Sequence, residues 1–193
     1  ALTHLTGVWT MRIIVGMTGA SGAIFGVEFL RRCNAEKYLI LTKWGRYVLK
    51  EETGLTEHHL AEHAKKTFSD DDMTAPFASG LPPFDALVVV PCSISTMAKL
   101  ACGLGDTLLG RVAQVAMKER RKIILALRES PLSTLALEQA HKLSQLGVVI
   151  MPLSPPFYHK PQTIEQLVEQ FTDKLIGELG METSYAWRPE ALE

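Results

Sequence analysis

Five short apolar runs, separated by longer amphipathic stretches, restrict the possible folds of this chain more than any other feature of its sequence. Each run is rich in β-branched residues, is continuous rather than alternating, and is bounded by charge, glycine or proline, which is typical of strands buried on both faces. The runs cover residues 12–17, 38–43, 85–91, 122–128 and 148–152.

The stretches between these runs have helical periodicity, and such alternation favours parallel strands joined by right-handed helical crossovers. We therefore predict a three-layer α/β domain with a doubly wound parallel sheet of the flavodoxin or Rossmann type. Ser133 is expected to cap one helix, whose apolar side would include Leu135, Leu137 and Ala140. The predicted helices cover residues 21–34, 43–52, 56–66, 93–118, 133–146 and 162–180. The polar segment 67–83, rich in proline and glycine, is predicted to be a long loop.

The length of 193 residues suits one domain, and we assign residues 11–193 to it, including a C-terminal helix and tail. Residues 1–10, "ALTHLTGVWT", are interpreted as an upstream extension or an expression remnant. A net charge of -1 argues against a protein that coats nucleic acid, which needs a broad excess of Lys and Arg. The longest apolar runs have the length of strands, so no membrane span is expected.

The three cysteines are too few for a disulfide framework, and no C-x-x-C pair or His/Cys cluster offers a metal site. We therefore expect reduced thiols, no bound metal and a cytoplasmic location. Cys92 is interpreted as a packed, unreactive thiol, because no histidine lies in a suitable local position.

Ligands of doubly wound sheets bind beyond the carboxyl ends of the strands, so the loops after the strands are the places to search for a site. In "TGASG", after the first run, Thr18 or Ser21 could cap the next helix, whose free N–H groups would bind an anion. A tight turn with a serine cap explains this loop equally well, and the G-x-G-x-x-G spacing of dinucleotide sites is absent.

A second helix start, in "PCSISTMAKLACG", carries the hydroxyl groups of Ser93, Ser95 and Thr96. Two such starts at one edge of a sheet exceed what helix capping requires. Together they could hold a phosphate and the sugar chain attached to it.

Several charged or polar residues lie where they could reach the same edge. Arg111 and Lys118 are seven residues apart and therefore share one helix face, and Arg128 and Glu129 stand where a strand ends. The consecutive run 70–72 of three aspartates is interpreted as a solvated or capping charge run rather than a magnesium motif.

Taken together, these stretches resemble the UbiX family of flavin prenyltransferases, formerly described as aromatic-acid decarboxylases. The resemblance extends from Met11 to about Lys174. It rests on "GMTGASGAIFGV", "TKWGRYVLKEET", "APFASG", "VVVPCSISTMAKLACG", "LLGRVAQVAMKERRKIILALRESPLS" and "GVVIMPLSPPFYHKPQTIEQLV".

The resemblance implies a flavodoxin-like fold and bound FMN. It also implies transfer of the dimethylallyl group of dimethylallyl phosphate to reduced FMN, forming two bonds and a fourth ring. The product, prenylated FMN, is the cofactor of UbiD-type decarboxylases, and the family is associated with ubiquinone biosynthesis. Many members are homo-oligomers, often dodecamers, with each site built from more than one subunit.

The resemblance also assigns roles to individual residues. FMN binding is assigned to Gly19, Ala20, Ser21, Thr42, Ser93, Ile94, Ser95, Thr96 and Arg128. Binding of the substrate phosphate is assigned to Arg111, Lys118, Tyr158 and Lys174, where Lys174 replaces the more usual arginine and loses its forked geometry. Ser21, Glu52 and Glu129 match the active-site set, and either carboxylate could be the base. Trp187 loosely matches a C-terminal aromatic residue that covers the site, and a tryptophan that some relatives carry before "APxASG" is missing here.

Three other functions compete with this one. A flavin-dependent cysteine decarboxylase of the phosphopantothenoylcysteine type would carry a histidine after the first strand and an asparagine-rich loop, where this chain has "GASGA" and "PCSIS". A non-catalytic FMN carrier would not need the four phosphate-binding residues. A direct aromatic-acid decarboxylase has no recognisable residue set in this sequence.

Overall fold

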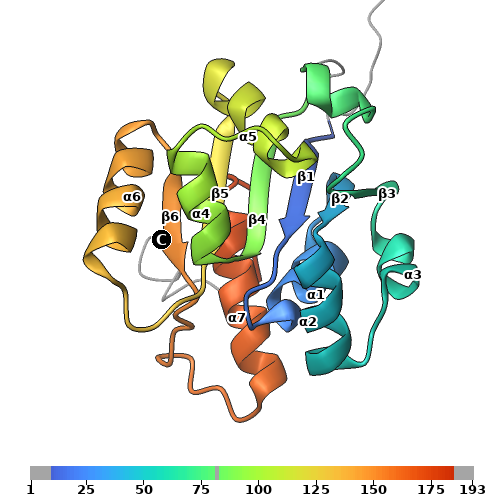
Figure 1. Cartoon of the computed structure of the whole chain (residues 1–193). Coiled ribbons are helices and arrows are strands. Elements are labelled where there is room, and N and C mark those ends of the chain that lie inside the picture. Colours follow the sequence, from blue (N-terminus) through green and yellow to red (C-terminus); the bar gives the residue numbers. More distant parts are fainter. Residues whose placement is uncertain (1–9, 81–82, 185–193) are drawn as a thin grey trace, which may run out of the picture.

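A computed structural model describes residues 10–80 and 83–184 and contains one parallel sheet of six strands (Figure 1). The strands are β1 (Arg12–Met17), β2 (Glu36–Leu41), β3 (Lys66–Ser69), β4 (Ala86–Cys92), β5 (Lys122–Leu127) and β6 (Val149–Pro152). Their order across the sheet is β3-β2-β1-β4-β5-β6, so the direction of winding reverses between β1 and β4. This confirms the predicted doubly wound fold and places the expected ligand edge at the ends of these two strands.

Helices cover both faces of the sheet, with α4 in front of it and α7 behind it in Figure 1. The α-helices are α1 (Ala23–Arg32), α2 (Lys43–Thr53), α3 (Glu57–Leu60), α4 (Ile94–Ala101), α5 (Leu108–Lys118), α6 (Thr134–Gln145) and α7 (Ile164–Gly177), and the short 3-10 helices are η1 (Ala61–His63) and η2 (Pro76–Ser79). Buried side chains of α4, α5 and α6 form one core with the sheet, and those of α1, α2, α3 and α7 form a second core on the other face.

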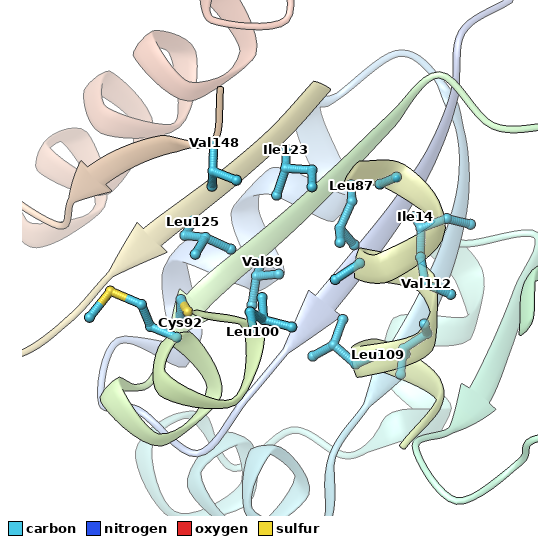
Figure 2. Packing of buried hydrophobic residues seen from close by; sticks show 14 of the residues in the cluster. Ile14, Leu87, Val89, Cys92, Leu100, Leu109, Val112, Ile123, Leu125 and Val148 are labelled. Carbon is cyan, nitrogen blue, oxygen red and sulfur yellow. The ribbon is translucent and has the colours of Figure 1, made fainter. Parts of the chain in front are cut away.

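The front core holds α4 and α5 in place. Figure 2 shows Leu109 and Val112 of α5 and Leu100 of α4 on the side of the sheet that carries Ile14 and Val89. All five side chains are almost completely buried, and burying each large apolar side chain contributes about 1.5–3 kcal/mol. This packing holds α4 and the first turn of α5 against the sheet near its carboxyl edge.

The segment 67–83, predicted to be a loop, instead begins within β3 and also contains η2. The strand β3 has four residues, of which only Phe68 is fully buried, because β3 is an edge strand that exposes Lys66. So short a run with one buried residue gives almost no periodic signal. Of the helix predicted over 56–66, only α3 is α-helical, and it ends at Leu60. The short 3-10 helix η1 follows it, and Lys66 already belongs to β3.

The helix predicted over 93–118 is two helices, α4 and α5, separated by residues 102–107. Gly103 adopts a φ of 71° after α4, and the Thr107 side chain accepts a hydrogen bond from the Gly110 N–H to begin α5.

The cap predicted for α6 is confirmed, because the Ser133 side chain accepts a hydrogen bond from the Ala136 N–H. The predicted apolar side of this helix is wrong for Leu135 and Leu137, which are exposed, and is confirmed for Ala140, which packs against the core. The fully buried side chains of α6 are instead Ala136 and Leu143.

Close packing of α1 against β4 requires a glycine at position 26. A Cβ atom added to Gly26 would lie 2.5 Å from the Val90 carbonyl oxygen and 2.8 Å from Met17 Cε. We predict that Gly26→Ala lowers the free energy of unfolding by about 1–3 kcal/mol, as measured by urea denaturation, because the helix must move away from the sheet. The matched control is Gly177→Ala, whose added Cβ would meet only Thr183 Cγ2 at 3.5 Å. Equal stability of Gly26→Ala and the wild type would contradict this packing.

Candidate functional site

The loops after β1 and β4 are tied together by one buried hydroxyl group. Thr18 Oγ1 donates a hydrogen bond to the Pro91 carbonyl oxygen at 2.8 Å and accepts one from the Ser93 N–H at 2.9 Å. Thr18 therefore does not cap α1, and the prediction that it could is wrong. It joins the two loops across the point where the sheet reverses.

The start of α1 is closed by a carboxylate from α2. Gly22 occupies the N-cap position with a φ of 102°, and no side chain at that position caps the helix, so the capping role predicted for Ser21 is wrong. Instead, Glu52 Oε2 accepts hydrogen bonds from the N–H groups of Gly22 at 2.8 Å and Ala23 at 2.9 Å. The anion site expected at this helix start is thus filled by the protein itself.

The same contacts shift the pKa of Glu52. Partial burial would raise it, but hydrogen bonds from the Ser21 side chain and from the two N–H groups, together with the nearby charge of Arg128, hold the pKa below its ordinary value. Ser21, Glu52 and Arg128 are therefore neighbours at the edge of the sheet.

The start of α5 is closed by Asp70 in a similar way. Asp70 Oδ1 accepts a hydrogen bond from the Leu109 N–H at 2.8 Å, and its backbone carbonyl accepts one from the Leu108 N–H at 2.8 Å. Burial raises the pKa of Asp70, although the hydrogen bonds that its carboxylate makes with the Leu109 N–H and the Thr107 side chain oppose the shift. Of the two roles left open for the aspartate run, Asp70 therefore caps a helix, and Asp72 accepts hydrogen bonds from Thr74 in a local turn.

The starts of α2 and α4 remain open. Thr42 and Ser93 cap these helices by accepting hydrogen bonds from Gly45 and Thr96, the third residue of each helix. The preceding N–H groups, those of Lys43, Trp44, Ile94 and Ser95, have no acceptor within residues 10–80 and 83–184. Helix-terminal N–H groups without partners attract anions, so α2 and α4 provide the donors that α1 and α5 do not.

These open helix starts face a cleft of about 380 Å³. The predicted residues that line it are Gly19, Thr42, Ser93, Ser95 and Thr96. Gly19 allows the loop after β1 to approach the first turn of α2 closely, because a Cβ atom there would lie 2.4 Å from Trp44 Cβ. Ala20 is buried and Ile94 is partly buried, and both lie beside the cleft without lining it.

The cleft also contains residues that the sequence analysis did not assign to the site. Lys43 and Trp44 follow β2 directly, so their position at a strand end could have revealed them. Lys99 lies in α4 and Thr107 caps α5, and the sequence does not show that these two side chains face the cleft. The cleft residues missed are Lys43, Trp44, Asp70, Asp71, Lys99, Leu100, Thr107, Leu109 and Gly110.

Arg128 and Glu129 lie at the end of β5, as predicted, and both are exposed. The Arg128 N–H donates to the Cys92 carbonyl oxygen at 3.0 Å, which fixes this loop beside the one that follows β4. Glu129 Oε1 accepts a hydrogen bond from the Ser130 N–H at 3.0 Å.

The four residues assigned to the substrate phosphate do not meet within one chain. Arg111 and Lys118 are exposed on α5, which covers the front of the sheet, whereas Lys174 is on α7 behind it, in a separate hollow beside β6. Tyr158 lies in the loop between β6 and α7, with its ring centroid 4.6 Å from that of His159. Trp187 lies outside the described residues.

Two further expectations concern cysteine and metal chemistry. Cys92 is fully buried, and burial raises its pKa to about 12, which agrees with an unreactive thiol. Among the residues that the structure describes, no three His, Cys, Asp or Glu side chains are grouped to hold a metal ion.

Among the residues that the structure describes, no helix combines the length and apolar character needed to cross a membrane.

Comparison with known proteins agrees with this architecture. The model of the Flavoprotein family matches residues 4–180. A flavin prenyltransferase UbiX of Thermoplasma acidophilum is 39% identical over 89% of this chain and 96% of its own length. A probable UbiX-like flavin prenyltransferase of Bacillus subtilis is 36% identical over 95% of this chain and 91% of its own length.

Two solved structures are also similar. A dodecameric FMN-dependent UbiX-like decarboxylase of Escherichia coli O157:H7 has a TM-score of 0.87 and 36% identity, covering 92% of this chain and 99% of the other. AnUbiX in complex with FMN and dimethylallyl pyrophosphate has the same TM-score and identity, covering 93% of this chain and all of the other (100%). The chain belongs to the Flavoprotein family. Within that family it is a member of the UbiX group of flavin prenyltransferases, which confirms the resemblance seen in the sequence.

The closed start of α1 leads to a test of stability. Glu52→Gln removes the charge that faces two N–H groups, so we predict that the unfolding temperature at pH 7 falls by about 2–4 °C, the effect of losing about 1 kcal/mol of capping energy. Because the pKa of Glu52 is lowered in the folded state, its contribution is complete above the ordinary carboxyl pKa of 4.5 and is lost as the pH falls through the folded-state value. The difference between wild type and variant should therefore shrink in acid, as measured by thermal unfolding at several pH values.

The control is Glu51→Gln at the preceding, exposed position, which should not change the unfolding temperature. A difference between wild type and Glu52→Gln that stays constant down to pH values well below 4.5 would show that the charge of Glu52 does not stabilise α1.

Proposed function

We propose that this protein is a flavin prenyltransferase that transfers the dimethylallyl group of dimethylallyl phosphate to reduced FMN. The observation that carries the proposal is the cleft with two open helix starts, in a chain of the UbiX group. The prenylated FMN would serve a UbiD-type decarboxylase, with ubiquinone biosynthesis as one setting. The free cysteines support a cytoplasmic location.

The cleft suits the phosphate and ribityl chain of FMN. A phosphate at the starts of α2 and α4 would accept hydrogen bonds from the free N–H groups there, next to the ammonium groups of Lys43 and Lys99, which line the cleft. The hydroxyl groups of Ser95 and Thr96 can bind those of the ribityl chain. The flavin ring would then extend toward Ser21 and Arg128.

The residues that neutralise the departing phosphate would come from more than one copy of the chain. Cleavage of the allylic carbon–oxygen bond places negative charge on the phosphate, and Arg111, Lys118, Lys174 and the Tyr158 hydroxyl can stabilise it. Since α5 and α7 lie on opposite faces of the sheet, Arg111 and Lys174 reach one substrate only if a neighbouring copy supplies one of them. The similar protein of E. coli O157:H7 is a dodecamer, which agrees with such an assembly.

The geometry favours Glu129 over Glu52 as the proton acceptor. Reduced FMN, when bound, supplies the nucleophilic nitrogen and carbon atoms, and a proton must leave when the second bond closes. Glu52 is occupied by two N–H groups, and its lowered pKa makes it a weaker base. Glu129 lies at the same edge and accepts only the hydrogen bond from the adjacent Ser130 N–H within the described residues, so we assign proton removal to Glu129 and the positioning of Ser21 to Glu52.

The alternative of a cysteine decarboxylase has only the fold in its favour. A phosphopantothenoylcysteine decarboxylase is similar with a TM-score of 0.62 but only 19% identity. The histidine and the asparagine-rich loop expected for that activity are absent from "GASGA" and "PCSIS".

The proposed activity can be tested by incubating the protein with reduced FMN and dimethylallyl phosphate without oxygen. We predict a flavin product heavier by one five-carbon unit in mass spectrometry. A metal chelator should not reduce the yield of this product, because arginine and lysine side chains, rather than a metal ion, neutralise the departing phosphate. Glu129→Gln should retain FMN and lose the product. Absence of the product from wild-type protein with bound FMN would contradict the proposed function, and magnesium-dependent recovery after chelation would contradict the role given to the cations.

The shared site can be tested by mixing subunits. Arg111→Ala and Lys174→Ala should each be inactive alone. If the two residues act from different copies, co-expression of the two variants should restore about a quarter of the wild-type activity. Random mixing gives each site an intact Arg111 with a chance of about one half and an intact Lys174 with the same chance, so about a quarter of the sites have both. No recovery in verified mixed oligomers would show that one chain supplies both residues.

A further inference from the structure

The order of the strands gives the bound flavin a direction. The residues proposed to lie near the ring follow β1 and β5, whereas the open start of α2 follows β2. The next strand beyond β2 is the edge strand β3, which is followed directly by Asp70 and Asp71. A group attached to the far side of the phosphate would therefore extend toward these two aspartates.

Both aspartates line the cleft in which the phosphate is proposed to bind. Asp70 already occupies the N–H groups of Leu108 and Leu109, so the start of α5 cannot accept a second phosphate. The Asp71 carboxylate is exposed and has no hydrogen bond or ion pair within the described part of the chain. The cleft thus combines open N–H groups at the starts of α2 and α4 with two carboxylates beside the start of α5, where Lys99 is a cationic neighbour of Asp70.

Building on the proposed function, we propose that Asp70 and Asp71 make the site specific for FMN and exclude FAD. FAD carries an adenylate on the phosphate that FMN leaves free. The second phosphate of FAD would lie against the two carboxylates and would find no free N–H group at α5. Like charges that face each other in one cleft, together with unpaired polar groups, are an effective means of rejecting a competing ligand.

The test compares dissociation constants for FMN and FAD, measured by calorimetry at low salt. The wild type should bind FMN at least about tenfold more tightly than FAD. Asp70→Asn combined with Asp71→Asn should reduce this ratio about five- to tenfold, mainly through tighter FAD binding, because asparagine keeps the capping oxygen of residue 70 and removes the charge. Higher salt should reduce the ratio for the wild type by screening.

Asp72→Asn is the matched control, since Asp72 belongs to the same run but binds Thr74 and does not line the cleft. It should leave the ratio unchanged. Equal binding of FMN and FAD by the wild type, or an unchanged ratio in the double variant, would refute the role of the aspartates and leave the proposed function intact. Equal loss of both flavins in the double variant would show that the aspartates bind the flavin instead. Failure of the wild type to bind either flavin would contradict the proposed function itself, and this inference with it.

Discussion

The site depends on which helix starts keep free N–H groups. The helices α1, α2, α4 and α5 begin near the carboxyl edge of the sheet, and residues at the starts of the last three line the cleft. The protein closes α1 and α5 with its own carboxylates. Glu52 closes α1 and Asp70 closes α5, whereas α2 and α4 are capped only at their third residue. A phosphate is therefore directed to α2 and α4, and the position of the rest of the ligand follows from that choice.

The sheet brings these helix starts together. Its winding reverses between β1 and β4, so the loops after these strands diverge to opposite faces and leave a crevice. Thr18 joins the two loops across this crevice through hydrogen bonds to Pro91 and Ser93. The nearly complete burial of Leu100 and Leu109 anchors α4 and α5 on one side of it. The cleft is consequently built on rigid elements, which suits a site that must hold a flavin in one orientation.

The sequence alone was sufficient for the fold class and for the cleft hydroxyl groups that follow β4, but not for that of Thr107. Continuous apolar runs mark the buried strands, and loops that follow parallel strands must meet at one edge, so Ser93, Ser95 and Thr96 could be placed correctly, whereas Thr42 was assigned only through the family resemblance. The partner of the α1 start could not be predicted, because Glu52 lies 30 residues beyond Gly22 and reaches it only through tertiary packing. β3 was missed because an edge strand of four residues leaves little pattern.

The separation of Arg111 from Lys174 was also invisible in the sequence, because matching motifs do not say which copy of the chain supplies each residue. The most direct test of the account is a crystal structure of the protein with FMN bound. The phosphate oxygens should accept hydrogen bonds from N–H groups at the starts of α2 and α4, with Glu52 and Asp70 still in place. A phosphate bound instead at the start of α1 or α5, with the corresponding carboxylate displaced, would contradict the account.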